Sequence, residues 1–351
     1  MDDRRRQFLT FTAFGLALAI PARALAQPQR ILREAGPDTG GQSPDVLPPG
    51  QLPPELRHFA NALEIRETAR QGALTLLWLG GPASSTTPPI LTLEEGRASG
   101  QISITERESA TVPQLVVDNR GKTHVLMLAG EILIGGKQDR VLREDILLPP
   151  LSGPRNVGVL CVEQGRWSTG QPGFQPDKQP MVAAPSLRSR LMDKAEQGEV
   201  WREVDRAARA SGAPQTSSSY QRVYEAPAVL GQVEQAERAI DPSRIAGGLG
   251  AAVFVNSRFA GIDVFRDPGL FAREWRKLLR AWVVEAAREV PAPVDLGLLR
   301  KRAVGLVAGI AGVSGMAHGN AGAGRVYEFH VGGVRGAALV AERQMVHLAL
   351  M

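Results

Sequence analysis

The sequence predicts an α+β fold, mainly an antiparallel β-sheet or sandwich made of N- and C-terminal strands, with a central group of helices. Short segments rich in Val, Ile and Leu recur between turns from about residue 60 to residue 162. Amphipathic helical patterns occupy the middle of the chain, and strand-like segments return at its end. Consecutive strands joined by short polar links favour antiparallel pairing over a βαβ array.

Six strands are predicted in the first half of the chain. The residues LTLEEGRASG between the first two of them are typical of one or two helical turns. The predicted strands are Leu74 to Leu79, Ile102 to Thr105, Leu115 to Asp118, His124 to Leu128, Asp145 to Leu148 and Val157 to Val162.

The middle of the chain predicts three helices and one hairpin. A first helix begins at Ser186 and stops at Gly212, and a second, weaker helix covers residues 225–240. Two apolar runs flank Asn256-Ser257, which indicates a β-hairpin turn. The third helix has the clearest start, since Asp267 can cap it and the following proline suits its first position.

The C-terminal part predicts three more strands, at residues 325–331, 335–342 and 344–350. The glycine-rich segment 315–324 before them is interpreted as a turn or flexible loop. We expect these strands to complete the first sheet, so that residues 59–351 form a single α+β domain. Two separate domains are the alternative interpretation.

The N-terminus predicts export. A basic cluster precedes an apolar stretch that is short for a membrane span, and Ala24-Leu25-Ala26 supplies a signal-peptidase site. We therefore expect a signal peptide over residues 1–26, cleaved between Ala26 and Gln27. Its arginines resemble a twin-arginine signal, with a plain secretory signal as the alternative. The protein would then be periplasmic or secreted, without a stable membrane anchor, and residues 27–58 would form a disordered Pro/Gly-rich spacer.

Composition narrows the function classes. The formal net charge is +5, and two of those charges belong to residues 1–26. Basic residues form no run, so we expect no nucleic-acid partner. Cys161 is the only cysteine, which rules out an intramolecular disulfide, and the five histidines show no metal-binding spacing. We therefore predict no metal site and no cofactor, and a strand-interior cysteine is interpreted as a small buried hydrophobe.

The segment LAGEILIGGKQDR, residues 128–140, concentrates polar side chains directly after an apolar run. A phosphate-binding P-loop requires G-x-x-x-x-G-K-[ST] leading into a helix. Here Glu131 stands where the first glycine belongs, and Gln138 follows Lys137 where a hydroxyl is needed. Gly135-Gly136 instead permits a tight reversal between two strands, so the segment is predicted to be a polar hairpin.

A second polar segment, CVEQGRW at residues 161–167, also follows an apolar strand. Two strand ends with similar polar inventories can meet at one edge of a sheet, where binding clefts are common. The candidate ligand-binding residues are Glu131, Lys137, Gln138, Arg140, Glu163, Gln164, Arg166 and Trp167.

Three functions are compatible with these residues. In the first, the cations neutralise an anionic small molecule and Trp167 stacks on it. In the second, Glu131 or Glu163 is the general base of a hydrolase. In the third, the charged groups form ion pairs that join two strand ends, and no small molecule binds. The sequence does not decide whether the protein is an enzyme, and it identifies no protein partner.

These residues also carry a family resemblance. Segments 112–150 and 157–167, with the motifs GEILIGGKQDR and CVEQGRW, resemble the ARPP-1 domain, the ADP-ribosylglycohydrolase and rhodanese-phosphatase-associated protein domain of unknown function. Segments 200–206, 259–282 and 345–350 resemble later parts of the same family. Ile132 stands where the family often has an acidic residue, and Asp139 where asparagine is common. The resemblance implies a phosphorylated or nucleotide-like ligand near the candidate residues.

Overall fold

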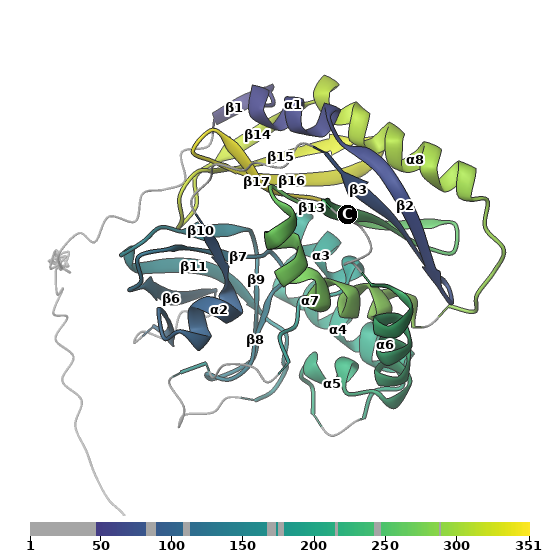
Figure 1. Cartoon of the computed structure of the whole chain (residues 1–351). Helices are drawn as coiled ribbons and strands as arrows, with labels where there is room; N and C mark the ends of the chain where they lie inside the picture. Colours follow the sequence, from purple (N-terminus) through teal and green to yellow (C-terminus); the bar gives the residue numbers. More distant parts are fainter. Residues whose placement is uncertain are drawn as a thin grey trace, which may run out of the picture. The chain divides into compact units, whose positions relative to one another are not determined.

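Nine strands form the largest sheet of the computed structural model (Figure 1). Their order is β1-β14-β15-β16-β17-β13-β12-β3-β2, and every neighbouring pair is antiparallel. The fold is α+β, as predicted. The C-terminal strands continue the sheet that contains β2 and β3, but of the six strands predicted in the first half of the chain only β3 belongs to it, and the other five lie in separate sheets. The strands are β1 (Leu47–Gln51), β2 (Glu64–Gln71), β3 (Leu74–Gly80), β12 (Gly248–Val255), β13 (Arg258–Phe265), β14 (Ser314–His318), β15 (Arg325–Val331), β16 (Val334–Ala341) and β17 (Gln344–Leu350).

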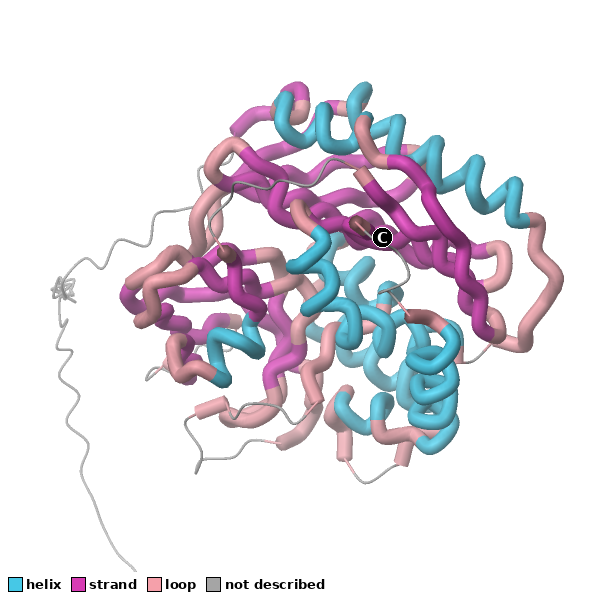
Figure 2. Tube along the Cα trace, viewed as in Figure 1, coloured by secondary structure: helices cyan, strands magenta, loops and turns pink. Residues whose placement is uncertain are grey.

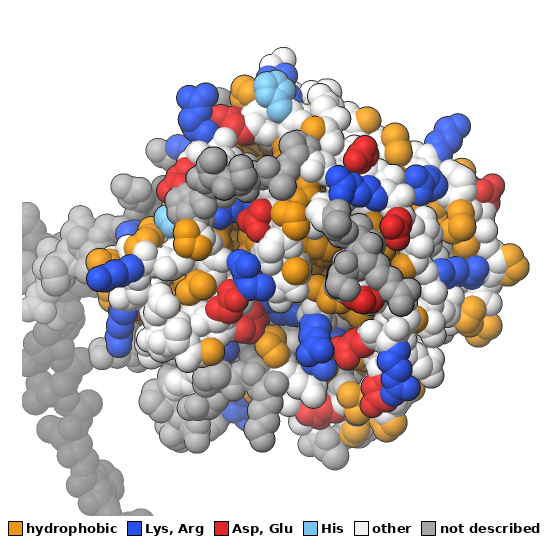
Figure 3. Space-filling view, viewed as in Figure 1, with side chains coloured by type: hydrophobic (Ala, Val, Ile, Leu, Met, Phe, Trp, Pro, Cys, Tyr) orange, Lys and Arg blue, Asp and Glu red, His pale blue; other side chains and the backbone are white. Residues whose placement is uncertain are grey.

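The structure describes residues 47–81, 89–107, 113–166, 173–174, 179–214, 217–241, 247–287 and 289–351. The predicted signal peptide, its cleavage site, residues 27–46 of the predicted spacer and Trp167 lie outside these ranges. Within them, no helix is both long enough and apolar enough to cross a membrane. Acidic and basic side chains are interspersed among the described residues on the face drawn in Figure 3.

The predicted spacer is wrong for residues 47–58. Strand β1 lies at the edge of the large sheet, and helix α1 (Pro54–Asn61) follows it. Leu52 and Leu56 are almost fully buried against one face of the sheet, so the apolar side chains between the prolines gain enough burial to order this segment.

Both faces of the large sheet are covered. Strand β3 is buried along its whole length because alternate side chains enter different cores. Leu76 and Trp78 belong to the core that includes helix α7 (Pro268–Ala286). Leu77 and Leu79 belong to the core that includes α1 and helix α8 (Leu296–Gly309). Figure 2 shows these helices on opposite sides of the sheet.

The central helices are α3 (Pro185–Met192), α4 (Gln197–Ser211), α5 (Gln221–Tyr224) and α6 (Pro227–Ala239). The single helix predicted from Ser186 to Gly212 is therefore two helices. Lys194 interrupts it with a φ of 56°, whereas Gly212 ends α4 with a φ of 65°, as predicted. Helix α7 starts as predicted, because the Asp267 carboxylate accepts a hydrogen bond from the backbone N–H of Leu270 at 2.7 Å.

Two smaller sheets, ordered β10-β7-β4 and β5-β6-β11-β9-β8, enclose a separate core with helix α2 (Leu93–Ala98). Strands β5, β6, β7, β10 and β11 lie where the sequence predicts strands, and β8 and β9 belong to the predicted hairpin. Strand β4 was not predicted, and it pairs with β7 in parallel. The bounds are β4 (Ile90–Thr92), β5 (Ile102–Glu106), β6 (Gln114–Asn119), β7 (His124–Met127), β8 (Ile132–Leu133), β9 (Arg140–Leu142), β10 (Ile146–Leu148) and β11 (Gly153–Cys161).

The glycine-rich segment 315–324 is not wholly a loop. Its first residues belong to strand β14, which pairs with β15 on one side and β1 on the other. A Cβ atom at Gly315 would lie 2.7 Å from Leu52 Cδ2, so the absence of a side chain there permits Leu52, which lies between β1 and α1, to pack closely on β14. A short 3-10 helix, Ile310–Gly312, connects α8 to this strand.

Candidate functional site

The polar hairpin forms, but Leu133 pairs with Arg140, so the connection runs over residues 134–139 where a tight reversal at Gly135-Gly136 was predicted. Strands β8 and β9 pair in antiparallel fashion, and the glycines between them adopt positive φ angles of 118° at Gly135 and 56° at Gly136. A Cβ at Gly136 would lie 2.6 Å from Phe174 Cζ and 2.8 Å from Glu106 Oε1. The turn therefore requires glycine for both its backbone angle and its surroundings.

The hairpin also meets the CVEQGRW segment, since β9 pairs with β11. The backbone N–H of Asp139 donates to Glu163 Oε2 at 3.1 Å, and Gln138 Nε2 donates to the Glu163 carbonyl at 2.9 Å. Arg166 then donates to Glu163 at 2.7 Å and to Asp139 at 3.0 Å. We call Asp139, Glu163 and Arg166 the strand-end cluster.

The guanidinium of the strand-end cluster is already paired with both carboxylates of the cluster. Hydrogen bonding to Glu163 raises the pKa of Arg166, so its guanidinium stays charged. Burial raises the pKa of Asp139, whose carboxylate accepts further hydrogen bonds from Ser219 Oγ at 2.6 Å and Gly135 N at 2.9 Å. An external anion would have to compete with these carboxylates for the guanidinium.

Arg140 lies deeper, with an exposed fraction of 1%. Its guanidinium donates to Glu106 at 3.3 Å and to Gln138 Oε1 at 3.4 Å, and it contacts the Cys161 sulfur. Burial raises the pKa of the Cys161 thiol, which is opposite to the change that activates a nucleophile. Cys161 is buried, in agreement with its interpretation as a core residue.

The remaining candidates at this edge are less enclosed. Gln164 is exposed, and its carbonyl accepts a hydrogen bond from Ser218 Oγ. Lys137 is half-buried, and its backbone N–H donates to Glu106 Oε1 at 3.0 Å. The structure therefore brings five predicted residues together around β9 and β11. Four of them form a chain of hydrogen bonds: Gln138, Arg140, Glu163 and Arg166. Lys137 joins them through Glu106, which also contacts Arg140.

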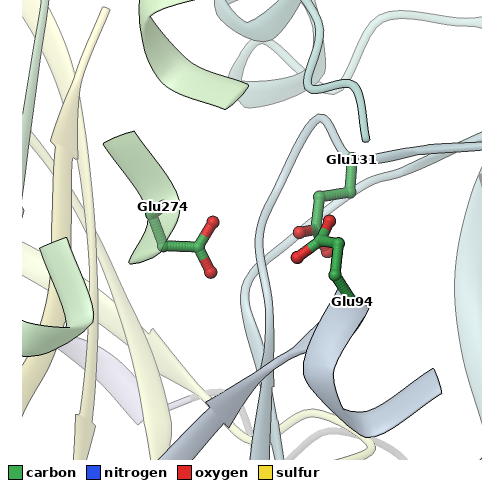
Figure 4. Close-up of side chains that lie close together, drawn as sticks. All are labelled: Glu94, Glu131 and Glu274. Atoms are coloured by element: carbon green, nitrogen blue, oxygen red, sulfur yellow. The ribbon is translucent and has the colours of Figure 1, made fainter. Parts of the chain in front are cut away.

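Glu131 belongs to a different group. Its carboxylate contacts the ammonium of Lys277 on α7, and that ammonium also lies 2.9 Å from Glu94 Oε1 and 2.7 Å from Glu274 Oε2. Figure 4 shows the three carboxylates approaching one another from α2, α7 and the segment before β8. We call Glu94, Glu131, Glu274 and Lys277 the carboxylate–lysine cluster.

Burial sets the protonation states of this cluster. It raises the pKa of Glu131 to about 8, with Glu94 and Glu274 adding to the rise and Lys277 opposing it. Burial also raises the pKa of Glu274. Burial acts in the same direction on Glu94, but Lys277 and several hydrogen bonds outweigh it, so the pKa of Glu94 is lowered. Burial lowers the pKa of Lys277, yet the three carboxylates together raise it well above its ordinary value.

A cavity of about 150 Å³, which we call the small cavity, reaches the carboxylate–lysine cluster. Glu94 and Glu131 of the cluster line this cavity together with Arg97. The remaining lining residues are Leu93, Ala98, Ile132, Pro180 and Met181. A cavity with two convergent carboxylates in different protonation states is a typical setting for proton transfer.

A family model of the ARG and Rhodanese-Phosphatase-superfamily-associated Protein domain, ARPP-1, matches residues 62–351. The chain belongs to the ARPP-1 family. No curated protein and no solved structure matches it. The ARPP-1 match includes the polar hairpin, the CVEQGRW segment and every member of the carboxylate–lysine cluster.

The side-chain oxygens of Glu94, Glu131 and Glu274 in this ARPP-1 domain lie within 4.8 Å of one another, a spacing that suits a hard divalent cation. However, the Lys277 ammonium contacts all three carboxylates and supplies their positive counter-charge. The geometry therefore fits an internal ion-pair cluster better than a metal centre.

Sequence reasoning missed Glu94, Glu274 and Lys277. One signal was available: Glu274 and Lys277 interrupt the apolar stripe of α7, beside Trp275 and Leu278, and both are buried. Charged residues are seldom fully buried without partners, so two of them on a core-facing stripe indicate a polar cluster inside the fold.

Proposed function

We propose that this ARPP-1 domain is a hydrolase that binds a small anionic substrate in the small cavity, with Glu131 as its proton-exchanging group. One observation carries the proposal: the buried Glu131 carboxyl, with a pKa of about 8, lines a cavity together with Glu94 and lies against Lys277. A group with such a pKa is partly protonated and partly ionised near neutral pH, as general acid–base catalysis requires.

The surrounding residues support distinct roles. Ionised Glu131 would accept a proton from water while the water oxygen forms the new bond to the substrate. The same carboxyl would then return the proton to the leaving group as the old bond breaks. Lys277 keeps Glu131 in place and limits the rise of its pKa. Arg97 also lines the cavity, and its guanidinium, which donates to the Phe174 carbonyl at 3.1 Å, is the type of side chain best suited to a phosphate or carboxylate.

The contacts within the strand-end cluster favour the interpretation in which its charged residues form ion pairs that join two strand ends. Glu163 is held by Arg166, and no hydrogen bond or ion pair among the described residues joins it to Glu131. Glu131 is therefore the better supported of the two predicted general bases. Anion binding at Arg140 and Arg166 stays a prediction, and a ligand there must displace Glu106, Glu163 or Asp139.

The first experiment is a thermal-shift screen of residues 27–351 against nucleotides, ADP-ribose, sugar phosphates and dicarboxylates. A ligand at 100 times its dissociation constant stabilises the fold by about 2.7 kcal/mol. Compounds that shift the midpoint are then followed for turnover by mass spectrometry, with Glu131→Gln and Glu163→Gln as the test and control variants.

We expect Glu131→Gln to retain the ligand-induced shift while losing turnover by at least about a hundredfold. Glu163→Gln should retain turnover. Full turnover in Glu131→Gln overturns the catalytic role, and a screen without any shift overturns the binding role of the cavity.

We also propose that the chain is exported through its N-terminal segment and cleaved after Ala26. The support is the order of basic, apolar and small residues in positions 1–26. Mass measurement of the protein from a periplasmic fraction should give an N-terminus at Gln27. Arg5→Lys combined with Arg6→Lys should block export if the route is twin-arginine, whereas unchanged export of that variant assigns the plain secretory route.

A further inference from the structure

A second cavity, of about 330 Å³, lies where the β14–β17 part of the large sheet meets α3 and the β9–β10 connection. We call it the large cavity. It shares no lining residue with the small cavity. Its volume falls in the range of sites that hold small organic ligands. Its walls are mostly apolar and include Leu191, Met192, Met316, Val326, Phe329 and Ala337.

Charged side chains at this cavity are paired with one exception. Arg143 makes no hydrogen bond through its guanidinium and no ion pair with the residues that the structure describes. The paired groups are Lys194 with Glu328 at 2.8 Å, Glu144 with His318 at 3.6 Å, Asp145 with His347 at 2.6 Å, and Arg335 with Asp193. The lining therefore offers one positive charge that forms no ion pair with a carboxylate of the described residues, although the neighbouring Glu144 is close enough to interact with it electrostatically.

The backbone holds Arg143 firmly at the cavity. Its N–H donates to the Gly158 carbonyl on β11 at 3.2 Å, and its side-chain Cδ lies 3.5 Å from where a Cβ at Gly158 would be. Two residues later, Asp145 accepts hydrogen bonds from the Ala129 N–H at 2.8 Å and from His347. Arg143 as a whole is half-buried, so it is partly shielded from water.

We propose that the large cavity binds a small amphipathic carboxylate, with its apolar tail against the cavity walls and its carboxylate on Arg143. A guanidinium presents forked donors that match a carboxylate. Glu144 is adjacent to Arg143 and repels additional negative charge, which favours a monoanion over a phosphate dianion. The apolar walls favour an alkyl or aryl body over a sugar or nucleotide.

Isothermal titration of residues 27–351 with octanoate, octanol and octylammonium tests the inference. Octanoate should bind at least about tenfold more tightly than octanol, because a hydrogen bond to a charged partner adds that much affinity. Octylammonium should bind more weakly still. Equal affinity for octanoate and octanol, or no binding of octanoate, overturns the proposal.

Variants locate the binding. Arg143→Gln should weaken octanoate binding about tenfold and leave octanol binding unchanged. Glu144→Gln should tighten octanoate binding, which a purely structural role would not produce. Ala337→Phe should block both ligands by filling the cavity.

Arg155→Gln, which changes an exposed arginine on β11, is the matched control and should bind octanoate as the unmodified chain does. Unchanged octanoate binding in Arg143→Gln, or weaker binding in Glu144→Gln, overturns the assignment.

Discussion

The Nδ1 atom of His347 lies 2.6 Å from Oδ2 of Asp145, and its Nε2 atom lies 3.3 Å from Oδ1 of Asp263. Asp263 in turn receives two hydrogen bonds from Arg188, at 2.6 and 2.8 Å. Charges therefore alternate along a buried chain of four residues. This chain joins the β9–β10 connection, β17, β13 and α3, so one polar network links the smaller sheets, the large sheet and the helices.

The charged His347 imidazole stabilises the fold, so we expect the free energy of unfolding to fall as the pH becomes alkaline. Burial lowers its pKa, but Asp145 and Asp263 outweigh burial and raise the pKa to about 9, above about 6.5 in the unfolded chain. The stabilisation is complete below pH 6.5 and is lost as the pH rises through 9, on the order of 3 kcal/mol. Urea unfolding at several pH values between 6 and 10 measures this loss of unfolding free energy.

His347→Gln is the control for this pH dependence. The difference in unfolding free energy between the unmodified chain and the variant should shrink as the pH rises, because only the imidazole loses a proton in this window at that site. A difference that stays constant from pH 6 to pH 10 would contradict a charged His347.

Lys277 should be the most costly single charge to remove. Lys277→Met leaves the buried Glu131 and Glu274 and the half-buried Glu94 without their cation, and breaking a buried pair in this way costs roughly 3–5 kcal/mol. Adding Glu131→Gln should recover part of the loss because one of the uncompensated charges disappears. Chemical unfolding measures both, and Lys301→Met on the exposed side of α8 should change little. A cost within the range of that surface control would argue against a charged cluster.

Arg166→Ala tests whether the strand-end cluster is structural. Removal of the guanidinium leaves Glu163 and Asp139 without their cation, so we expect a loss of roughly 1–3 kcal/mol in unfolding free energy. Arg155→Ala is the control, since its side chain is exposed. Normal stability of Arg166→Ala together with lost binding of an anion would instead support the predicted anion-binding role.

Gly136 and Gly165 are a matched pair that separates the cost of the backbone angle from the cost of close contacts. Both adopt positive φ angles, so alanine at either costs roughly 1–2 kcal/mol from its Cβ alone. At Gly136 the Cβ would also approach Phe174 and Glu106 within 2.8 Å, whereas at Gly165 it meets open space. Gly136→Ala should therefore destabilise the protein by about 1–3 kcal/mol more than Gly165→Ala. Equal thermal midpoints would show that the turn adjusts at no cost.

Local chemistry made much of the fold predictable. The glycine pair of the polar hairpin, the Asp267 cap of α7 and the strands of the smaller sheets other than β4 follow from residue type and spacing within a few positions. The contact between the polar hairpin and the CVEQGRW segment was also predictable, because both follow strands that end in polar residues.

The partners of the charged residues were not predictable in the same way. Arg140 pairs with Glu106 from β5, and Asp139 binds Ser219 from the turn before α5. Glu131 is close in sequence to both, yet it lies against α7. Such pairings depend on the three-dimensional packing of distant elements, which the local pattern of one sequence does not specify.

The two outer strands of the large sheet have a consequence for behaviour at high concentration. Unpaired strand edges promote association between copies of a protein. Strand β2 carries the charged sequence EIRETARQ, and the Ile65 carbonyl accepts a hydrogen bond from Arg300 on α8 at 3.2 Å. At the opposite edge, β1 contains Pro49, which has no N–H to donate. Both edges thus disfavour the addition of a further strand, which protects the folded chain against aggregation through its sheet.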